Sequence, residues 1–67
     1  MAKTEHIFIT EGRTLQGESF EFYTHGQELQ LYWDDGEMSV KELQPWEDPK
    51  LEAELWSKEI MAAVHLN

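Results

Sequence analysis

The chain has 67 residues, with 14 Asp and Glu against 5 Lys and Arg, a net charge of −9 and no cysteine. This length predicts one small domain over residues 1–67, with little room for a deep catalytic cleft. The absence of cysteine excludes disulfides and thiolate metal sites. The acidic balance disfavours DNA and anionic membranes, because their phosphates attract Lys and Arg. No apolar run approaches the ~18 residues of a membrane span, and no signal-like apolar region follows Met1, so we expect a cytoplasmic location.

Despite this charge, the chain is expected to fold. Hydrophobic residues make up 40% of it and aromatic residues 12%, including 3 Trp. Aromatic side chains bury large areas, and here they follow a regular pattern that disordered chains lack.

The first strand is predicted at about residues 5–10. Its connection to the second strand, residues 11–18, has two interpretations. Either the connection is a long loop, or the second strand starts near Thr14, bulges at Gly17 and buries Leu15.

Three further strands are predicted at about residues 18–24, 28–34 and 37–42, where apolar and polar residues alternate. This period of two is typical of strands with one buried face. His25-Gly26 and Asp35-Gly36 are typical two-residue hairpin loops, because Gly and Asp tolerate the positive φ of such turns. The alternation and the loops together predict an antiparallel meander.

These loops also predict a register. The first pairs Phe22 with Leu29, and the second pairs Leu31 with Val40, so apolar side chains meet on one face. A slip of one residue would turn that set outward. The C-terminal segment adds two residues to this set, Trp56 and Ile60. The predicted core is Ile7, Ile9, Phe20, Phe22, Leu29, Leu31, Trp33, Met38, Val40, Trp56 and Ile60.

A helix is predicted at about residues 49–65. Asp48 is a good N-cap, Pro49 suits the first helical position, and no further Gly or Pro follows. Its apolar residues form two stripes, one with Leu51, Leu55, Ala62 and Leu66, the other with Ala53, Trp56, Ile60, Ala63 and Val64. Either the whole arc is buried, or one stripe meets another subunit or a partner.

The predicted fold is therefore α+β, an antiparallel meander of about four strands packed by one C-terminal helix; an SH3-like small barrel with a C-terminal helix is the alternative. The order of elements resembles that of small archaeal chromatin proteins. Their basic sheet is replaced here by Glu21, Glu28 and Glu37, so no direct binding of nucleic acid is expected.

No catalytic or metal motif is recognisable. His6, His25 and His65 lack the spacing of metal ligands, and the acidic segment 34–37 lacks the pattern of an EF-hand loop. There is no phosphate-binding loop and no nucleophile motif. We therefore expect neither an enzyme nor a cofactor.

Protein binding is the function that the sequence favours. Aromatic residues with a polar group, which are enriched at interfaces, alternate with acidic residues on the predicted outer face of the sheet. The candidate binding residues are Glu21, Tyr23, Glu28, Tyr32, Asp34, Asp35, Glu37 and Trp46.

The leading hypothesis is an inhibitor or masking protein that docks on the basic, nucleic-acid-binding surface of a larger protein. Phage anti-defence proteins, nuclease immunity proteins and antitoxins act in this way as classes. The alternative is a homo-oligomeric structural or accessory protein, such as a homodimer, that associates through the Leu51/Leu55/Leu66 stripe or a sheet edge.

Overall fold

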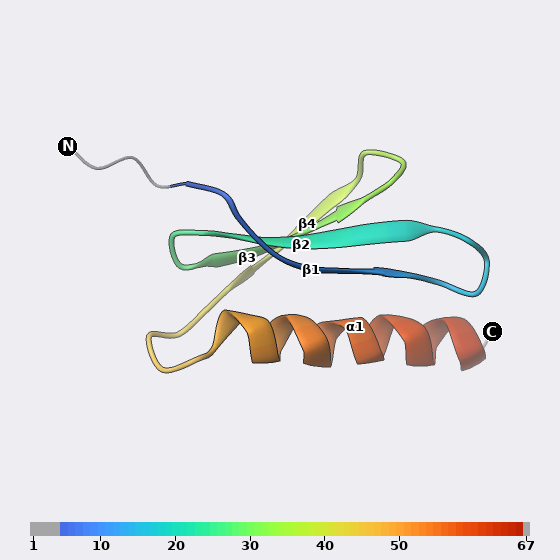
Figure 1. Ribbon diagram of the computed structural model, residues 1–67. Coiled ribbons are helices and arrows are strands. Elements are labelled where there is room, and N and C mark those ends of the chain that lie inside the picture. Colours follow the sequence, from blue (N-terminus) through green and yellow to red (C-terminus); the bar gives the residue numbers. More distant parts are fainter. Residues whose placement is uncertain (1–4, 67) are drawn as a thin grey trace.

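The computed structural model describes residues 5–66, which form four strands and one helix (Figure 1). Strands β1 (Ile7–Arg13), β2 (Ser19–His25), β3 (Glu28–Trp33) and β4 (Met38–Glu42) make one antiparallel sheet in the order β1-β2-β3-β4. Helix α1 (Pro49–Leu66) lies along one face of this sheet. The predicted α+β meander with a C-terminal helix is confirmed.

Helix α1 begins where the sequence predicts. A carboxylate oxygen of Asp48 accepts a hydrogen bond from the backbone N–H of Lys50 at 3.2 Å, and its backbone carbonyl accepts one from Glu52 at 2.9 Å. Asp48 is therefore the N-cap and Pro49 the first helical residue. No helix in the described part of the chain combines the length and apolar character that a membrane crossing requires.

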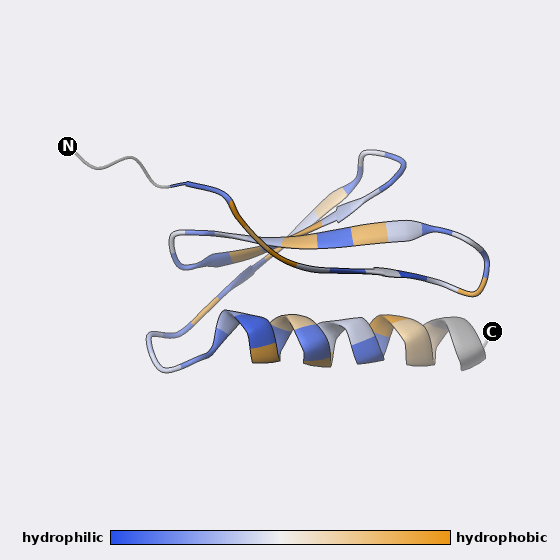
Figure 2. Ribbon diagram, in the orientation of Figure 1, coloured by the Kyte–Doolittle hydropathy of each residue, from blue (hydrophilic) through white to orange (hydrophobic). Residues whose placement is uncertain are grey.

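The core lies between the sheet and α1. Phe22 and Trp56 link the two layers, with ring centroids 5.5 Å apart. Figure 2 shows the alternation of apolar and polar residues along β2 that supplies its half of this core. The buried apolar residues are Phe20, Phe22, Leu29, Leu31, Leu43 and Ala53, and Ile9, Trp33, Trp56, Ile60 and Met61 are partly buried against them. Most of the predicted core is thus confirmed, but Ile7 is 58% exposed.

Only one apolar stripe of α1 faces the sheet, the one that contains Ala53 and Trp56. Leu51 and Leu55 of the other stripe are 51% and 45% exposed. The interpretation in which the whole arc is buried is therefore wrong. The side chains of residues 64–66 lie outside the described part of the structure.

The connection between β1 and β2 is a tight three-residue loop. The Gly17 N–H donates to the Thr14 carbonyl at 3.0 Å, and the Thr14 N–H donates to the Glu18 carbonyl at 2.8 Å. With a φ of 91° at Gly17, this is a type I turn closed by a glycine bulge. The prediction of a long loop is wrong, because β1 continues to Arg13. In the other alternative the bulge at Gly17 is right, but β2 begins at Ser19 and not near Thr14, and Leu15 is 73% exposed.

The turn between β3 and β4 has the same geometry, with a three-residue loop in place of the predicted two-residue loop. The Gly36 N–H donates to the Trp33 carbonyl at 3.0 Å, the Trp33 N–H donates to the Glu37 carbonyl at 2.9 Å, and Gly36 has a φ of 95°. Two carboxylates support this loop. Asp34 accepts the Ser19 N–H at 3.0 Å, and Asp35 accepts the Glu37 N–H at 2.9 Å.

The extra loop residue exchanges the two faces of β4 relative to the prediction. Met38 pairs with Tyr32 and Val40 with Gln30, one residue away from the predicted register. A shift of one moves every side chain of a strand to the opposite face. The prediction of Met38 and Val40 as core residues is therefore wrong, and they are 49% and 45% exposed.

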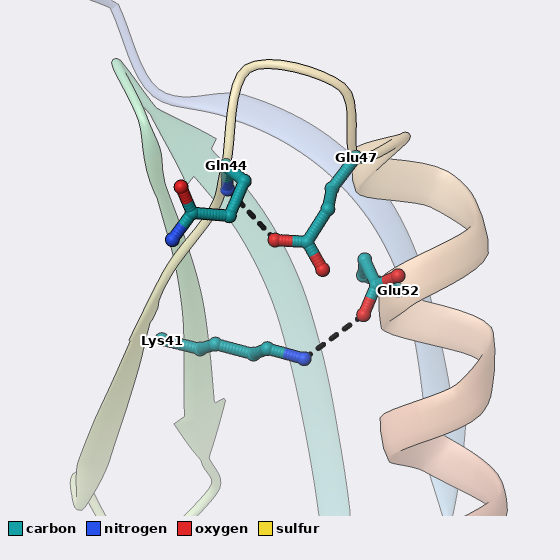
Figure 3. Close-up of polar contacts among 4 residues, drawn as sticks. All are labelled: Lys41, Gln44, Glu47 and Glu52. Atoms are coloured by element: carbon teal, nitrogen blue, oxygen red, sulfur yellow. Dashed lines mark hydrogen bonds and ion pairs between the residues drawn. The ribbon is translucent and has the colours of Figure 1, made fainter.

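Lys41 confirms this orientation of β4, because its side chain points toward α1. Its Nζ lies 2.9 Å from Oε1 of Glu52 on the helix (Figure 3). The hydrogen bond that Lys41 donates to the carboxylate of Glu52 is the main reason why the pKa of Lys41 is raised. In the following connection the Gln44 N–H donates to a carboxylate oxygen of Glu47 at 2.7 Å.

The loop between β2 and β3 is Gly26-Gln27, one residue later than predicted. Gly26 has a φ of 64°, whereas Gln27, like every other described non-glycine residue, does not have a positive φ. A positive φ at the first loop residue alone is typical of a type II′ turn. Phe22 consequently pairs with Leu31 in place of Leu29. This register error is an even number of residues, so the predicted faces of β2 and β3 are right although the pairs are wrong.

Candidate protein-binding face

The sheet face that points away from α1 is covered by no described element (Figure 1). We call it the outer face. Its members follow from the strand register and from the alternation of side chains along each strand. They are Phe8, Glu11 and Arg13 of β1, Ser19, Glu21, Tyr23 and His25 of β2, Glu28, Gln30 and Tyr32 of β3, and Met38, Val40 and Glu42 of β4.

A band of apolar side chains crosses this face from β1 to β4. Phe8 and Tyr23 meet edge to face with ring centroids 5.6 Å apart, and Tyr23 and Tyr32 meet in the same way at 5.6 Å. Met38 lies directly opposite Tyr32, and Val40 extends the band on β4. We call these five residues the apolar band. An exposed apolar surface with a polar border is typical of an interaction site.

Two pairs of glutamates border the apolar band. Glu11 lies directly opposite Glu21 on β1 and β2, and Glu28 lies directly opposite Glu42 on β3 and β4. Directly opposed like charges destabilise a sheet by roughly 0.2–1 kcal/mol per pair. The arrangement therefore costs folding stability.

The acidic border is not neutralised within the described chain. Arg13 is the one described Lys or Arg on the outer face, and its guanidinium contacts the Ser19 hydroxyl at 3.4 Å. The single ion pair among the described residues joins Lys41 to Glu52 on the opposite face. The outer face therefore presents unpaired carboxylates to solvent.

Hydrogen bonds hold the polar side chains of this face in place. The Tyr23 hydroxyl donates to Oε1 of Glu21 at 3.1 Å, and the Tyr32 hydroxyl donates to Oε1 of Gln30 at 3.0 Å. The amide of Gln30, which is only 6% exposed, donates to Glu28 at 3.3 Å. The hydrogen bond to Glu21, followed by desolvation and nearby negative charge, raises the pKa of Tyr23. The phenol therefore keeps its proton and orients the carboxylate.

An open depression of about 340 Å³ lies within the outer face. Tyr23 and Tyr32 form two of its walls, and Glu21 and His6 complete the lining. His6 stacks on His25 with ring centroids 4.4 Å apart, which fixes the imidazole at the border of the depression.

Half of the predicted binding residues come together here. The four that share the outer face are Glu21, Tyr23, Glu28 and Tyr32. Asp34 and Asp35 lie in the β3–β4 turn, where their carboxylates accept backbone hydrogen bonds and have a structural role.

The other two predicted residues lie elsewhere. Glu37 stands opposite Trp33, a residue that packs against the core, because the shifted register removes it from the outer face. Trp46 is 80% exposed in the connection between β4 and α1, at the end of β4 away from the β3–β4 turn.

Four residues of the outer face, Glu11, Met38, Val40 and Glu42, were not among the binding residues predicted from the sequence. A signal for the β4 residues was present, because a glycine at the third position of a loop favours a type I turn with a glycine bulge. Such a three-residue loop would have placed Met38 and Val40 beside the tyrosines.

Comparison with protein-family models, with curated proteins and with solved structures finds no significant match. Among residues 5–66 no three His, Asp or Glu side chains gather in a way that could hold a metal ion. The functional interpretation therefore depends on the chemistry of the outer face itself.

Proposed function

We propose that this protein is a small acidic binding module that docks through its outer face on a basic surface of a larger protein. The observation that supports this most directly is the presence of two directly opposed glutamate pairs, Glu11 with Glu21 and Glu28 with Glu42, on the two sides of the apolar band. Because such pairs lower folding stability, they need a reason other than folding. A partner with Lys and Arg side chains provides one.

The layout of the face fits an interface. Protein interfaces have an apolar, aromatic centre surrounded by a polar border, and Tyr is enriched among the residues that contribute most to binding. Solubility alone requires dispersed charge and no exposed apolar patch. The outer face instead combines concentrated negative charge with exposed Phe8, Met38 and Val40.

A nucleic-acid-binding groove is the kind of basic surface that we propose. The carboxylates would occupy positions that phosphates take in the partner's own complex, and the long-range attraction would speed association. The protein would then act as an inhibitor or masking protein of the anti-defence, immunity or antitoxin type, in the cytoplasm. It would not bind nucleic acid directly.

Affinity capture at low and high salt tests this proposal. The bait is the wild type, the face variant Glu11→Gln/Glu42→Gln, or the matched control Glu18→Gln/Glu54→Gln. The two control residues are exposed and lie outside the outer face, Glu18 just before β2 and Glu54 on α1. Both variants change the net charge from −9 to −7. The proposal is supported if the wild type and the control retain a basic nucleic-acid-binding protein that the face variant or high salt releases. The same protein must then bind the wild type again in purified form. Equal retention by all three baits contradicts it.

Homo-oligomerisation is the second candidate, supported by the exposed Leu51 and Leu55 of α1. The outer face itself disfavours self-association, because two identical acidic faces repel each other. Sedimentation of the wild type and of Leu51→Gln/Leu55→Gln separates the cases: an oligomer that the variant disrupts supports this candidate, and a monomer at high concentration eliminates it.

A further inference from the structure

The depression on the outer face has the shape of a corner between two aromatic rings. The planes of Tyr23 and Tyr32 meet at 87°, with ring centroids 5.6 Å apart. Glu21 lies directly opposite Tyr32 and two residues from Tyr23, so its carboxylate stands beside both rings. His6 borders the opening and meets Tyr23 edge to face at 6.5 Å.

The chemistry of this corner suits a cation. The face of an aromatic ring attracts Lys and Arg side chains because its quadrupole is negative there. One oxygen of Glu21 accepts the Tyr23 hydroxyl, and the other accepts no hydrogen bond from the described residues. Glu11, directly opposite on β1, adds a second negative charge.

The form of the depression indicates what kind of cation enters. Its volume of about 340 Å³ is near the lower limit of ligand pockets, which run from roughly 300 to 1,000 Å³, and it is open to solvent. A small molecule would be poorly retained there, because the depression does not enclose it. A side chain presented by another protein surface fits better, because the partner itself covers the opening.

We propose that the corner between Tyr23 and Tyr32 is a docking site for an arginine side chain of the partner, an inference that rests on the proposed function. A planar guanidinium stacks on one ring while its N–H groups reach the free oxygen of Glu21. An ammonium group lacks the plane for stacking and the fork for a carboxylate. Arginine is therefore preferred over lysine at this corner.

The test uses two blocked peptides of equal charge, acetyl-Gly-Arg-Gly-Arg-Gly-amide and its lysine counterpart, titrated into the isotopically labelled full chain at low salt. We expect the ring signals of Tyr23 and Tyr32 to move first and furthest. Since an exposed cation–π contact contributes modestly, the arginine peptide should bind about 2- to 5-fold more tightly than the lysine peptide.

A matched pair of variants locates the site. Tyr32→Leu removes one wall without changing the charge, and Phe8→Leu removes an aromatic ring of the same face that does not line the depression. We expect Tyr32→Leu to abolish the preference for arginine and Phe8→Leu to retain it. Tyr32→Phe, which keeps the ring, should also retain most of it. If Tyr32→Leu does not fold, the shifts of the wild-type ring signals and the affinities of the two peptides still decide whether the arginine site exists.

The outcomes separate this inference from the proposed function. Equal binding of both peptides, or shifts at the glutamates with stationary tyrosine rings, overturns the arginine site and leaves a basic partner in place. A lack of binding by either peptide at low salt contradicts both proposals. Tighter binding of the lysine peptide overturns the choice of arginine.

Discussion

Replacing Glu11 and Glu42 with glutamine should stabilise the fold and weaken binding to a basic partner at the same time. Each of the two side chains lies directly opposite another glutamate on the outer face, and neither makes a hydrogen bond or ion pair with a described residue. The substitution therefore removes repulsion without removing a favourable contact. If these glutamates only stabilised the fold, their replacement would lower the free energy of unfolding.

The expected gain follows from the geometry of the two pairs. A directly opposed like-charge pair costs roughly 0.2–1 kcal/mol, so relief of both should raise the free energy of unfolding by about 0.4–2 kcal/mol. In a domain of this size, about 1 kcal/mol corresponds to about 4–8 °C in Tm. The gain should disappear at high salt, because the Debye length falls from about 10 Å at 0.1 M to about 3 Å at 1 M.

Urea unfolding at low and high salt measures this gain, with Glu18→Gln/Glu54→Gln as the control of equal net charge. We expect the face variant to be more stable than the control at low salt, and the two to converge at high salt. Equal stability of the two variants at low salt would show that the opposed pairs carry no repulsion. Loss of stability in the face variant would refute the reasoning outright.

Three further predictions concern the sheet. Gly12→Ala should lower the free energy of unfolding in urea by about 1–3 kcal/mol, because the Cβ of alanine would lie 2.5 Å from the buried Phe20 ring. Adding Phe20→Leu to the Gly12→Ala chain should recover part of this loss. Val40→Thr should change that free energy by less than about 0.5 kcal/mol, and a loss above about 2 kcal/mol would place Val40 in the core. The pKa of Tyr23 is raised, so its stabilising contribution is present below its pKa in the unfolded chain and is lost as pH rises through its pKa in the folded chain. Absorbance titration of the phenolate should show the Tyr23 pKa lowered in Glu21→Gln, and an unchanged curve would contradict the contact.

The composition of the outer face was predictable only in part, and the reason lies in β4. Tyr23 and Tyr32 were placed correctly because the register error between β2 and β3 was even. Met38 and Val40 were placed on the wrong face because the β3–β4 loop holds three residues. The face of a strand depends on whether its loop length is odd or even, and alternation within β4 cannot reveal that.

The sequence by itself determined the class of the fold, since a period of two in three segments and a capped helix at Asp48 admit few other arrangements. It also determined the centre of the core, because Phe20, Phe22 and Leu31 are large, apolar and in phase. Only the tertiary structure decided which apolar residues stay exposed. The carboxylates of Asp34 and Asp35 accept hydrogen bonds from the backbone N–H groups of Ser19 and Glu37, and these bonds fix the loop length. They thereby place a second set of apolar side chains among the glutamates of an uncovered face, where a partner can reach them.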